Sequence, residues 1–419
     1  MTFSPLRRKA FPAVIAMPSR MAKDAPASDA PRISTEKVAA FRLTRHHLTS
    51  RAPALNLAQV AGDMAGAQAQ VMSAAQMSLW ARTRGLRRSD VEKALWHDRT
   101  LAKVWCMRGT VHLVPSNDYT VFVRGCAGRA DRDARWMVRR GRSIEMIERL
   151  LKHIGEILDR PLTRTEVAAR LGESFGTKRI QSGRGWGKEG EVDAFEVGGR
   201  PLSVGGLLSY ACVRGVACAG PPQGNEGTFV RPDVWFPRWR DLSVQDAEDA
   251  LLRAYLKAHG PATPADFAWW TYVTATTARA IWDRNAEDLA PVDADGRIAW
   301  VLRDDVPILK RARLKGPIVR LLPFFDSFLL GQKDHGHLVE ATHHKRVYRP
   351  QGWLSPVLLI DGRVAGVWSH ASKGTRLRVT IEPFRRLGSG IRELVDREAH
   401  DLGRFLEADE VRVTFATAP

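Results

Sequence analysis

Two stretches of the chain, residues 143–172 and 243–272, repeat one arrangement of helix caps and turns. Each begins with a serine, continues as an amphipathic helix of about four turns and reaches a proline turn. Thr163 and Thr263 then stand three positions before an acidic residue, which is the capping pattern of a second helix. A helix, a short turn and a capped second helix form the helix-turn-helix motif.

Strand-like segments follow each copy of this repeat. After the first copy, Ala211–Ala219 and Thr228–Arg231 flank a turn-rich stretch over 220–227. After the second copy, Pro291–Val301 contains an Asp-Gly dipeptide between apolar runs, which favours a two-residue hairpin turn. A helix-turn-helix followed by a hairpin is a winged helix, so the repeat predicts two winged-helix modules. The alternative is a pair of purely structural helical hairpins.

A third and more divergent unit is predicted before the repeat. A helix is expected over Leu57–Ala65, and Ser89 with Glu92 forms a capping box for another helix. A strand-like run, Val104–Val114, comes next. The order again suggests a winged helix.

The stretch between the two copies and the end of the chain differ in character. Residues 175–206 are rich in glycine, and we expect a mobile loop there. Arg184 in this loop is a candidate contact for a nucleic acid backbone, although a plain connector is an equal alternative. After about residue 320 a separate α+β module is predicted, with strands in 357–368, 376–381 and 411–415 and a helix over 391–407.

Together these segments predict an α+β protein built from tandem winged-helix domains. The expected divisions are a disordered basic tail at 1–33, winged-helix domains at 34–140, 141–240 and 241–320, and a C-terminal α+β module at 321–419. The second domain includes the glycine-rich loop. Three modules in one chain need no dimer, so a monomer is expected.

The balance of charge favours a polyanionic partner. The chain carries 64 Lys and Arg against 46 Asp and Glu, so its formal net charge is +18, and nucleic acid is the commonest polyanion. Arginines are dense between 124 and 142, where Trp136 and Met137 indicate a helix with a basic side rather than a disordered tail. Arg135 and Arg139 on this helix are candidate DNA contacts.

The cysteines and the lengths of the apolar runs indicate the cellular compartment in which the protein is expected. The 4 cysteines stand in apolar or mixed surroundings and form no C-x-x-C pair, which indicates buried, reduced thiols and a reducing cytosol. No apolar run reaches the length of about 18 residues that a transmembrane helix needs. We therefore expect a cytoplasmic protein without a membrane contact.

Signatures of cofactor and metal enzymes are missing from the sequence. It contains no Walker A loop, dinucleotide-binding glycine fingerprint, H-E-x-x-H or G-x-S-x-G motif, so no cofactor is expected. The histidines near 335–337 and 343–344 lack the cysteine pair or third ligand usual for zinc, and no metal is predicted. A basic run there is better suited to phosphate contact or to packing, and it consists of His343, His344, Lys345 and Arg346.

Six motifs occur in a characteristic order from about residue 38 to the end of the chain. They are GAQAQ at 66–70, AAQMSLWAR at 74–82, WCMRGTVHLV at 105–114, LPFFDSFLLG at 322–331, HHKRV at 343–347 and GWLSP at 352–356. In this order they resemble the AlkZ/YcaQ family of winged-helix DNA glycosylases.

The resemblance implies a fold, a substrate and a site. It implies tandem winged helices that form a curved, basic channel around double-stranded DNA, excision of N-alkylated purines and, in some members, unhooking of interstrand crosslinks. The family's glutamine–apolar–glutamine motif falls on Gln68 and Gln70, which are therefore the expected catalytic residues. The YcaQ branch has aspartate in the last place, so Gln70 resembles the AlkZ branch. Arg108 and His112 either face DNA or support the sheet.

Glutamine suits the hydrolysis of a bond that is already weak. An amide is no base near neutral pH, but it can accept a hydrogen bond from water and donate one to the substrate. A purine alkylated at N7 is cationic and leaves as a neutral base, so the remaining task is to position water against an oxocarbenium-like sugar. The resemblance thus implies a monofunctional DNA glycosylase, and the chemistry of glutamine leads us to expect that it prefers charged lesions. In an extended segment, Gln68 and Gln70 would share one strand face.

Two other functions compete with this interpretation. A non-enzymatic winged-helix transcription regulator would also bind DNA in a salt-sensitive way, but it would tolerate alanine at both glutamines. A metal-dependent nuclease is disfavoured because no acidic residues cluster in the sequence.

Overall fold

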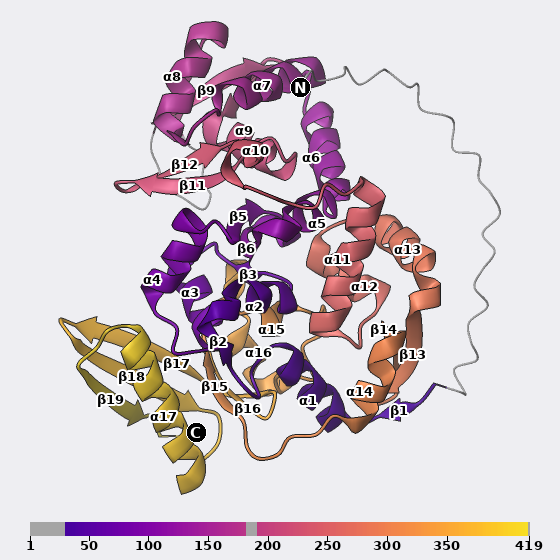
Figure 1. Ribbon diagram of the computed structural model, residues 1–419, viewed down its shortest axis with the longest axis vertical. Coiled ribbons are helices and arrows are strands. Elements are labelled where there is room, and N and C mark those ends of the chain that lie inside the picture. The colour runs from indigo at the N-terminus through magenta and orange to yellow at the C-terminus, as the bar shows by residue number, and fades with distance from the viewer. Residues whose placement is uncertain (1–29, 182–190, 418–419) are drawn as a thin grey trace.

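The computed structural model describes residues 30–181 and 191–417, which form three groups of helices with small sheets and a larger C-terminal sheet (Figure 1). This mixture confirms the predicted α+β class. Most of the predicted basic tail lies outside the described residues. Its last residues, β1 (Arg32–Ile33), pair in parallel with a strand of the third group and bury Ile33, so the boundary expected at residue 33 is too late.

The first group surrounds the short strand that ends at Gln68. β3, β6 and β5 form an antiparallel sheet in that order, so the run predicted as one strand over 104–114 is a hairpin with its turn at 106–110. The Asp90 carboxylate accepts the Arg87 N–H at 2.8 Å, which starts α4 earlier than the predicted Ser89 box. The elements are α1 (Thr35–Arg45), β2 (Ala52–Pro53), α2 (Leu57–Asp63), β3 (Ala67–Gln68), α3 (Met72–Trp80), β4 (Thr83–Arg84), α4 (Arg88–Glu92), β5 (Leu101–Trp105) and β6 (Val111–Pro115).

Two helices lead into the second group, in which a hairpin joins the short strand β7 to give the sheet β11-β12-β7. α9 continues through Val213, because Leu207, Leu208 and Ala211 recur at helical spacing and are buried; the strand predicted over 211–219 therefore starts only at Cys218. The elements are α5 (Tyr119–Arg124), α6 (Ala127–Arg139), α7 (Ile144–Ile157), β7 (Leu162–Thr163), α8 (Arg164–Phe175), β8 (Lys178–Gln181), β9 (Glu191–Val197), β10 (Arg200–Ser203), α9 (Val204–Val213), β11 (Cys218–Gln223), β12 (Glu226–Val230) and α10 (Pro232–Trp235).

The stretch over 175–206 is not the single loop that the sequence predicts. β8, β9 and β10 form an antiparallel sheet in the order β10-β9-β8, and residues 182–190 between the first two strands lie outside the described residues. Phe195 and Val197 are buried in the core of the second group, which gives the strands an apolar anchor. The glycines at 198–199 make the turn, because both adopt positive φ angles.

The second and third groups confirm the predicted helix caps, and the third group confirms the predicted hairpin. The Thr163 and Thr263 side chains accept the backbone N–H groups of Glu166 and Asp266, and each acid closes a capping box. The Asp-Gly dipeptide turns the hairpin β13–β14 with two positive φ angles. The elements are α11 (Val244–His259), α12 (Pro264–Thr271), α13 (Ala275–Arg284), β13 (Leu289–Ala294), β14 (Arg297–Leu302) and α14 (Val306–Arg311).

The C-terminal segment forms a five-stranded sheet in the order β15-β16-β17-β18-β19, packed against helix α17. Strand β19 runs parallel to β18, and α17 makes that crossover. The elements are β15 (Val319–Leu322), α15 (Ser327–Leu330), α16 (His344–Val347), β16 (Val357–Ile360), β17 (Arg363–Lys373), β18 (Arg376–Pro383), α17 (Ser389–Phe405) and β19 (Glu410–Phe415).

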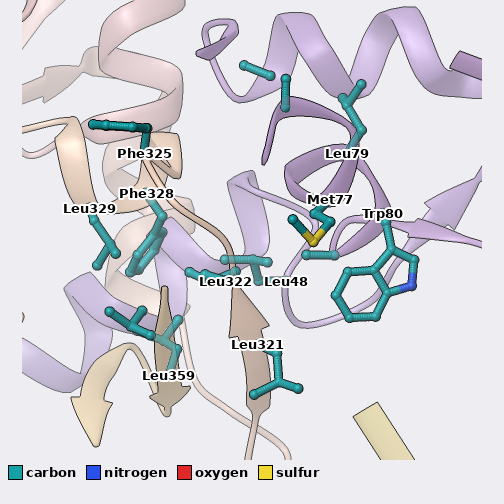
Figure 2. Packing of buried hydrophobic residues seen from close by; sticks show 14 of the residues in the cluster. Leu48, Met77, Leu79, Trp80, Leu321, Leu322, Phe325, Phe328, Leu329 and Leu359 are labelled. Carbon is teal, nitrogen blue, oxygen red and sulfur yellow. The ribbon is translucent and has the colours of Figure 1, made fainter. Parts of the chain in front are cut away.

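The C-terminal segment is not packed as a separate module, because it shares a hydrophobic core with the first group. Leu48, Met77 and Trp80 pack in one cluster with Leu322 and Phe328 (Figure 2). Residues that are far apart in sequence thus bury each other's apolar surface. The division of the chain into five units stays a prediction.

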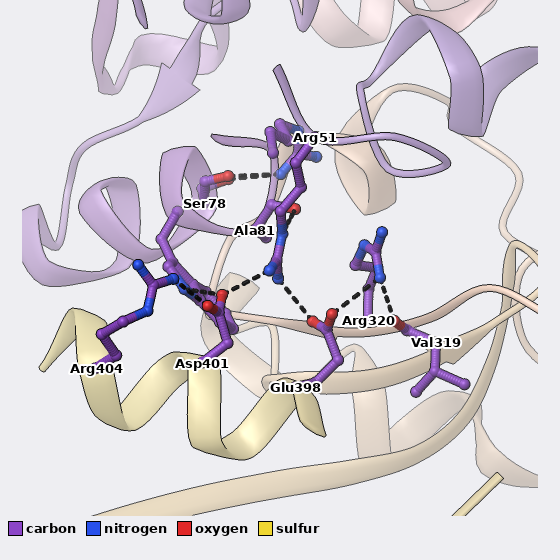
Figure 3. Close-up of polar contacts among 10 residues, drawn as sticks. Arg51, Ser78, Ala81, Val319, Arg320, Glu398, Asp401 and Arg404 are labelled. Carbon is purple, nitrogen blue, oxygen red and sulfur yellow. Dashed lines mark hydrogen bonds and ion pairs between the residues drawn. The ribbon is translucent and has the colours of Figure 1, made fainter. Parts of the chain in front are cut away.

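An ion-pair network adds to this contact between the first group and α17 (Figure 3). Arg51 donates to Glu398 at 2.8 Å and to Asp401 at 2.5 Å, and Arg320 donates to the other oxygen of Glu398 at 2.9 Å. The indole N–H of Trp80 also reaches Asp401. These partly buried pairs hold α17 against the strand β15 and the loop before β2.

Among the described helices, none has the length and hydropathy that would let it cross a membrane.

Candidate active site

A groove of about 1690 Å³ separates the second group from the sheet β3-β6-β5, with α6 along one wall. Gln70 lies in its lining together with Trp105 on β5, Trp136 on α6 and Tyr272 after α12. The charged side chains that line it are mostly basic, with Lys103, Arg129, Arg132, Arg139, Arg142, Arg164 and Arg179 against Asp133, Glu191, Asp193 and Glu226. Such a surface attracts a phosphate backbone.

Gln70 is exposed on this groove, just past the end of β3. The chain is still tied to the sheet at Ala69, whose N–H donates to the Val111 carbonyl at 2.7 Å. Regular pairing stops at Gln68, so the extended segment that would place both glutamines on one face is not formed through Gln70. One amide is therefore open to the groove.

Gln68 is instead held inside the protein. Its side chain is 7% exposed, and its Oε1 accepts a hydrogen bond from Nη2 of Arg108 at 2.5 Å. Because arginine has only donors, the atom facing it must be the amide oxygen, which fixes the orientation of the amide. Among the described residues no group accepts from Gln68 Nε2. The NH2 group therefore has no acceptor among the described residues, although Gln68 is not one of the side chains that line the groove.

Arg108 reaches Gln68 because of the tight turn between β5 and β6. Its φ angle of 50° and that of Gly109, 72°, both lie in the left-handed region, where glycine is favoured. A Cβ atom at Gly109 would lie 3.2 Å from the guanidinium of Arg129. Burial lowers the pKa of Arg108 to about 10, so the guanidinium stays charged at neutral pH.

His112 completes a chain of hydrogen bonds to Gln68. Its ring is 1% exposed, with Nδ1 at 3.2 Å from the Thr110 carbonyl oxygen and Nε2 at 3.2 Å from Nη2 of Arg108. Nδ1 must donate to the carbonyl, and Nε2 must then accept from Arg108. Burial, reinforced by the charge of Arg108, lowers the pKa of His112 well below its usual value. His112 is therefore a neutral support of Arg108.

This protonation state predicts a pH dependence of stability. His112 stays neutral in the fold but titrates near its ordinary pKa of about 6.5 when unfolded, so the unfolded chain binds more protons below that pH. The stabilisation by neutral His112 is complete above about pH 6.5 and is lost as the pH falls, by about 1.4 kcal/mol per pH unit.

The measurement compares His112→Gln, which keeps an acceptor for Arg108 but does not titrate, with the wild type in urea unfolding from pH 7.5 to 5.5. The free energy of unfolding of the wild type should fall more steeply with decreasing pH. Equal slopes would contradict the neutral assignment.

The motif at 322–331 does not line the groove. It positions Gly66, which begins the segment 66–70 that carries Gln68 and Gln70. The Ser327 hydroxyl donates to the Gly66 carbonyl at 2.5 Å. Gly66 has a φ of 92°, and a Cβ atom there would lie 3.1 Å from Cε of Met107 and 3.3 Å from Val114. Only glycine fits this close approach. The C-terminal segment thereby fixes the entry into β3.

The other residues expected to bind DNA are scattered. Arg139 lines the groove, whereas Arg135 on the same helix is exposed outside its lining. Arg184 lies outside the described residues. The basic run 343–346 lies apart from the groove, partly around a second hollow of about 1000 Å³ that also contains His335.

Packing accounts for much of that basic run. The ring of His343 stacks on Phe384 at 4.0 Å, and Arg346 pairs with Glu382 at 2.9 Å. His344 stacks on Tyr348 at 4.8 Å. Phosphate contact by these four residues stays a prediction, and the structure does not bring them together with Gln70.

Most of the residues that line the groove are not among those predicted from the sequence. Lys103 and Trp105 alternate with buried residues along β5, a strand signal that was available in the LAKVW run. Arg164 and Arg179 come from the second group, and no local pattern predicts that they approach the first group. Tertiary packing alone brings these side chains to one surface.

The thiols and histidines form no further reactive centre. All four cysteines are buried and free, as predicted, and burial raises the pKa of Cys126 to about 12. Within residues 30–181 and 191–417, no three His, Cys, Asp or Glu side chains are grouped so that they could hold a metal ion.

Comparisons with known proteins agree with this architecture. The family described as "DNA glycosylase AlkZ-like" matches residues 61–405. An "Interstrand DNA cross-link repair glycosylase" of Streptomyces sahachiroi is 30% identical over 383 residues, which cover 89% of this chain and 96% of that protein. The solved structure of the Streptomyces sahachiroi DNA glycosylase AlkZ superposes with a TM-score of 0.76 and 28% identity, over 92% of this chain and 100% of that one. The chain therefore belongs to the AlkZ-like family of DNA glycosylases.

Proposed function

We propose that this glycosylase hydrolyses the N-glycosidic bond of N7-alkylated purines in double-stranded DNA, with Gln68 and Gln70 at the reacting centre. The observation that carries the proposal is the exposed Gln70 amide in a groove lined by basic side chains. DNA would enter along this groove with its phosphates near the arginines. Family membership supports the reaction class.

The two amides would have different tasks. Gln70 is open to solvent and can accept a hydrogen bond from the attacking water, which it would hold against C1′ of the sugar. Gln68 has its oxygen occupied by Arg108, so its free NH2 would donate to the departing base. Arg108 and His112 are positioning residues in this scheme, because they hold Gln68 without meeting the substrate.

The residue types around Gln70 favour a charged lesion. Among the described residues that line the groove, the carboxylates come from α6 and from the second group, and none comes from the first group. Gln70 cannot take a proton from water at neutral pH. A lesion that already carries a positive charge needs no protonation to leave, so the amides suffice for it but not for a neutral base.

Crosslinks are a second substrate class for the same site. A relative that covers most of the chain is named for interstrand crosslink repair. The groove here has a volume of about 1690 Å³, which exceeds the roughly 300–1,000 Å³ of ordinary small-ligand pockets. We propose that bulky or crosslinked N7 adducts are hydrolysed while the base stays near the duplex. Under this proposal the base does not have to be extruded from the duplex before its bond is hydrolysed.

Lesion preference tests the proposal. Single-turnover release of 7-methylguanine is measured beside release of hypoxanthine and uracil from matched duplexes, all with a chelator present. We expect 7-methylguanine to be released and the two neutral bases to stay in the DNA. Comparable release of hypoxanthine or uracil would contradict the preference for charged lesions.

The same assay separates the competing functions. A transcription regulator would bind the duplexes in a salt-sensitive way and release no base from the 7-methylguanine duplex or from an N7-crosslinked duplex. A metal-dependent nuclease would cut DNA only when the chelator is left out.

A further inference from the structure

Two aromatic side chains of the groove lining are exposed, although the proposed hydrolysis uses neither of them. Tyr272 is 48% exposed and Trp136 is 42% exposed, whereas Tyr210 in the same lining is buried. The indole of Trp105 is already stacked on Phe229. A half-exposed ring in a groove that binds nucleic acid offers a face on which a base can stack.

The backbone of Tyr272 has a conformation that a tyrosine rarely adopts. Its φ of 69° and ψ of 22° lie in the left-handed region at the end of α12, where glycine or asparagine usually closes a helix. Its N–H donates to the Ala268 carbonyl at 2.9 Å, and the next residue, Val273, is buried. The surrounding packing thus fixes this conformation, and residues held in this way are concentrated at functional sites.

Two helices place Tyr272 at the turn between β5 and β6. Helix α12, which Tyr272 follows, packs against the residues 107–109 of this turn. Helix α6 is attached to the same turn, because Arg129 in its first turn donates to the Cys106 carbonyl at 3.1 Å. The end of α12 and the start of α6 therefore meet at this turn.

The glutamine segment ends at the same turn. The Ala69 N–H donates to the Val111 carbonyl, and β3 runs antiparallel to β6, so Gln70 comes at the level of Thr110, the residue that leaves the turn. Tyr272 and Gln70 thus lie at one end of the sheet β3-β6-β5, and both line the groove.

Arg132 on α6 orients the Tyr272 ring. Its guanidinium carbon lies 3.7 Å from the centre of the ring, so the guanidinium covers one face. Because the side chain is still 48% exposed, the other face is the one open to the groove. Arg132 forms no ion pair with any described residue, which leaves its charge free to meet a phosphate.

We propose that Tyr272 stacks on the damaged purine while Gln70 acts on its glycosidic bond, which makes Tyr272 a specificity-determining residue. The proposal rests on the proposed function, because it concerns the same site and the same lesion. A purine alkylated at N7 is cationic, and an aromatic ring attracts a cation to its face in addition to stacking on it. Unmodified guanine is neutral and lacks this attraction. Tyr272 therefore favours the lesion before any bond is broken.

The ring can reach the lesion while the damaged base stays near the duplex. Side chains that insert between base steps unstack the neighbouring bases and kink the DNA. Tyr272 would take the place of one neighbouring base on the face of the lesion, and Arg132 would contact the adjacent phosphate. The phosphate charge offsets the repulsion between Arg132 and the cationic purine.

The test measures binding, so its result does not depend on base release. One duplex carries 7-methylguanine on a 2′-fluoroarabinose sugar, whose fluorine slows loss of the base, and the matched duplex carries guanine on the same sugar. Fluorescence anisotropy gives the dissociation constant of each. We expect the wild type to bind the lesion duplex more tightly, and Tyr272→Asn to lose at least about fivefold of this preference, the low end of the effect of removing one stacked ring.

Two substitutions at this position separate stacking from support of the fold. Asparagine adopts the left-handed conformation readily, so Tyr272→Asn should keep a thermal unfolding midpoint close to that of the wild type while its preference is lost. Tyr272→Phe keeps the ring and should keep the preference.

Trp136→Leu is the matched control within the groove. It removes the other exposed ring, which lies one helical turn beyond Arg132 on α6. It should change the affinities for the lesion duplex and the guanine duplex by the same factor, so that the preference stays.

Four results would overturn the proposal. They are a wild type without preference for the lesion duplex, a Tyr272→Asn variant that keeps the preference, a Tyr272→Phe variant that loses it, and a Tyr272→Asn variant whose unfolding midpoint falls markedly. Release of ordinary 7-methylguanine by the wild type reports on the proposed function separately. If no base is released while the preference depends on Tyr272, the proposed hydrolysis fails and the stacking stands. Release with a preference that is independent of Tyr272 means the reverse.

Discussion

Replacing Gln70 with alanine is expected to lower the single-turnover rate of 7-methylguanine release by about 10²–10³-fold, the range found when one oriented hydrogen-bonding group is removed from an active site. The loss should fall on the chemical step, because the basic groove that we propose binds DNA is unchanged. Quenched-flow measurement of base release, beside fluorescence anisotropy of binding, separates the two. An unaffected rate would remove Gln70 from the mechanism.

The groove supplies a matched control for this change. Gln181 is also an exposed glutamine in the groove lining, but it comes from β8 of the second group. Gln181→Ala should leave the rate of base release within roughly twofold, because surface substitutions away from special features have small effects. A loss equal to that of Gln70→Ala would mean that both glutamines act through DNA binding.

Gln68→Ala should also slow base release, and the double variant should lose less than the product of the single losses, because the two amides act as a unit. Gln70→Asp provides the opposite change. A carboxylate can polarise water more strongly than an amide, so this variant is expected to gain release of neutral bases relative to wild type. Absence of any gain would show that the acceptor at this position does not set the lesion preference.

Asp326→Ala is expected to destabilise the fold by about 3–5 kcal/mol, the cost of removing one partner of a buried ion pair. Both oxygens of Asp326 accept from the Arg82 guanidinium, at 2.7 and 2.8 Å, and both side chains are 0% exposed. Asp326 also accepts from the hydroxyl of Ser78 and from the backbone N–H of Phe328 at the start of α15. Its removal leaves the Arg82 charge buried without a carboxylate.

Chemical denaturation of Asp326→Ala and of the wild type measures this effect. Glu340→Ala is the control, because its pair with Arg385 is largely exposed, at 46% and 78%, and such pairs contribute less than about 1 kcal/mol. Arg82→Met with Asp326→Leu should recover part of the loss, since no charge is then left unpaired. Equal destabilisation by Asp326→Ala and Glu340→Ala would contradict the structural role.

Asp326 also shows how a motif can identify a family without marking its chemistry. The LPFFDSFLLG run resembles the family as strongly as the glutamine segment does, but its Asp326 is fully buried and its Ser327 holds the Gly66 carbonyl. We therefore expect the activity of Asp326→Asn, corrected for its folded fraction, to stay close to wild type. Composition cannot tell a buried structural acid from a catalytic one, because the difference lies in solvent access.

The sequence by itself determined the local features of this protein. The capping boxes at Thr163 and Thr263 and the Asp-Gly hairpin follow from hydrogen bonds within four residues, so they form as predicted. Burial of the cysteines follows from the apolar residues beside them in the sequence. The α+β class follows from the hydropathy pattern of short segments, which is also a local property. The motifs sufficed to predict the family and to select Gln68 and Gln70.

Only the tertiary structure decided how the two glutamines differ and what surrounds them. Pairing of β3 with β6 puts Gln68 under Arg108, while Gln70 stays in the groove. The sheet β10-β9-β8 forms in a glycine-rich stretch because Phe195 and Val197 are buried in the core of the second group. The C-terminal segment packs against the first group because the two bury apolar surface against each other. These contacts join residues that are distant in sequence. The free energy of each contact depends on the apolar area and the charges that both partners bury, and a local sequence pattern describes only one partner.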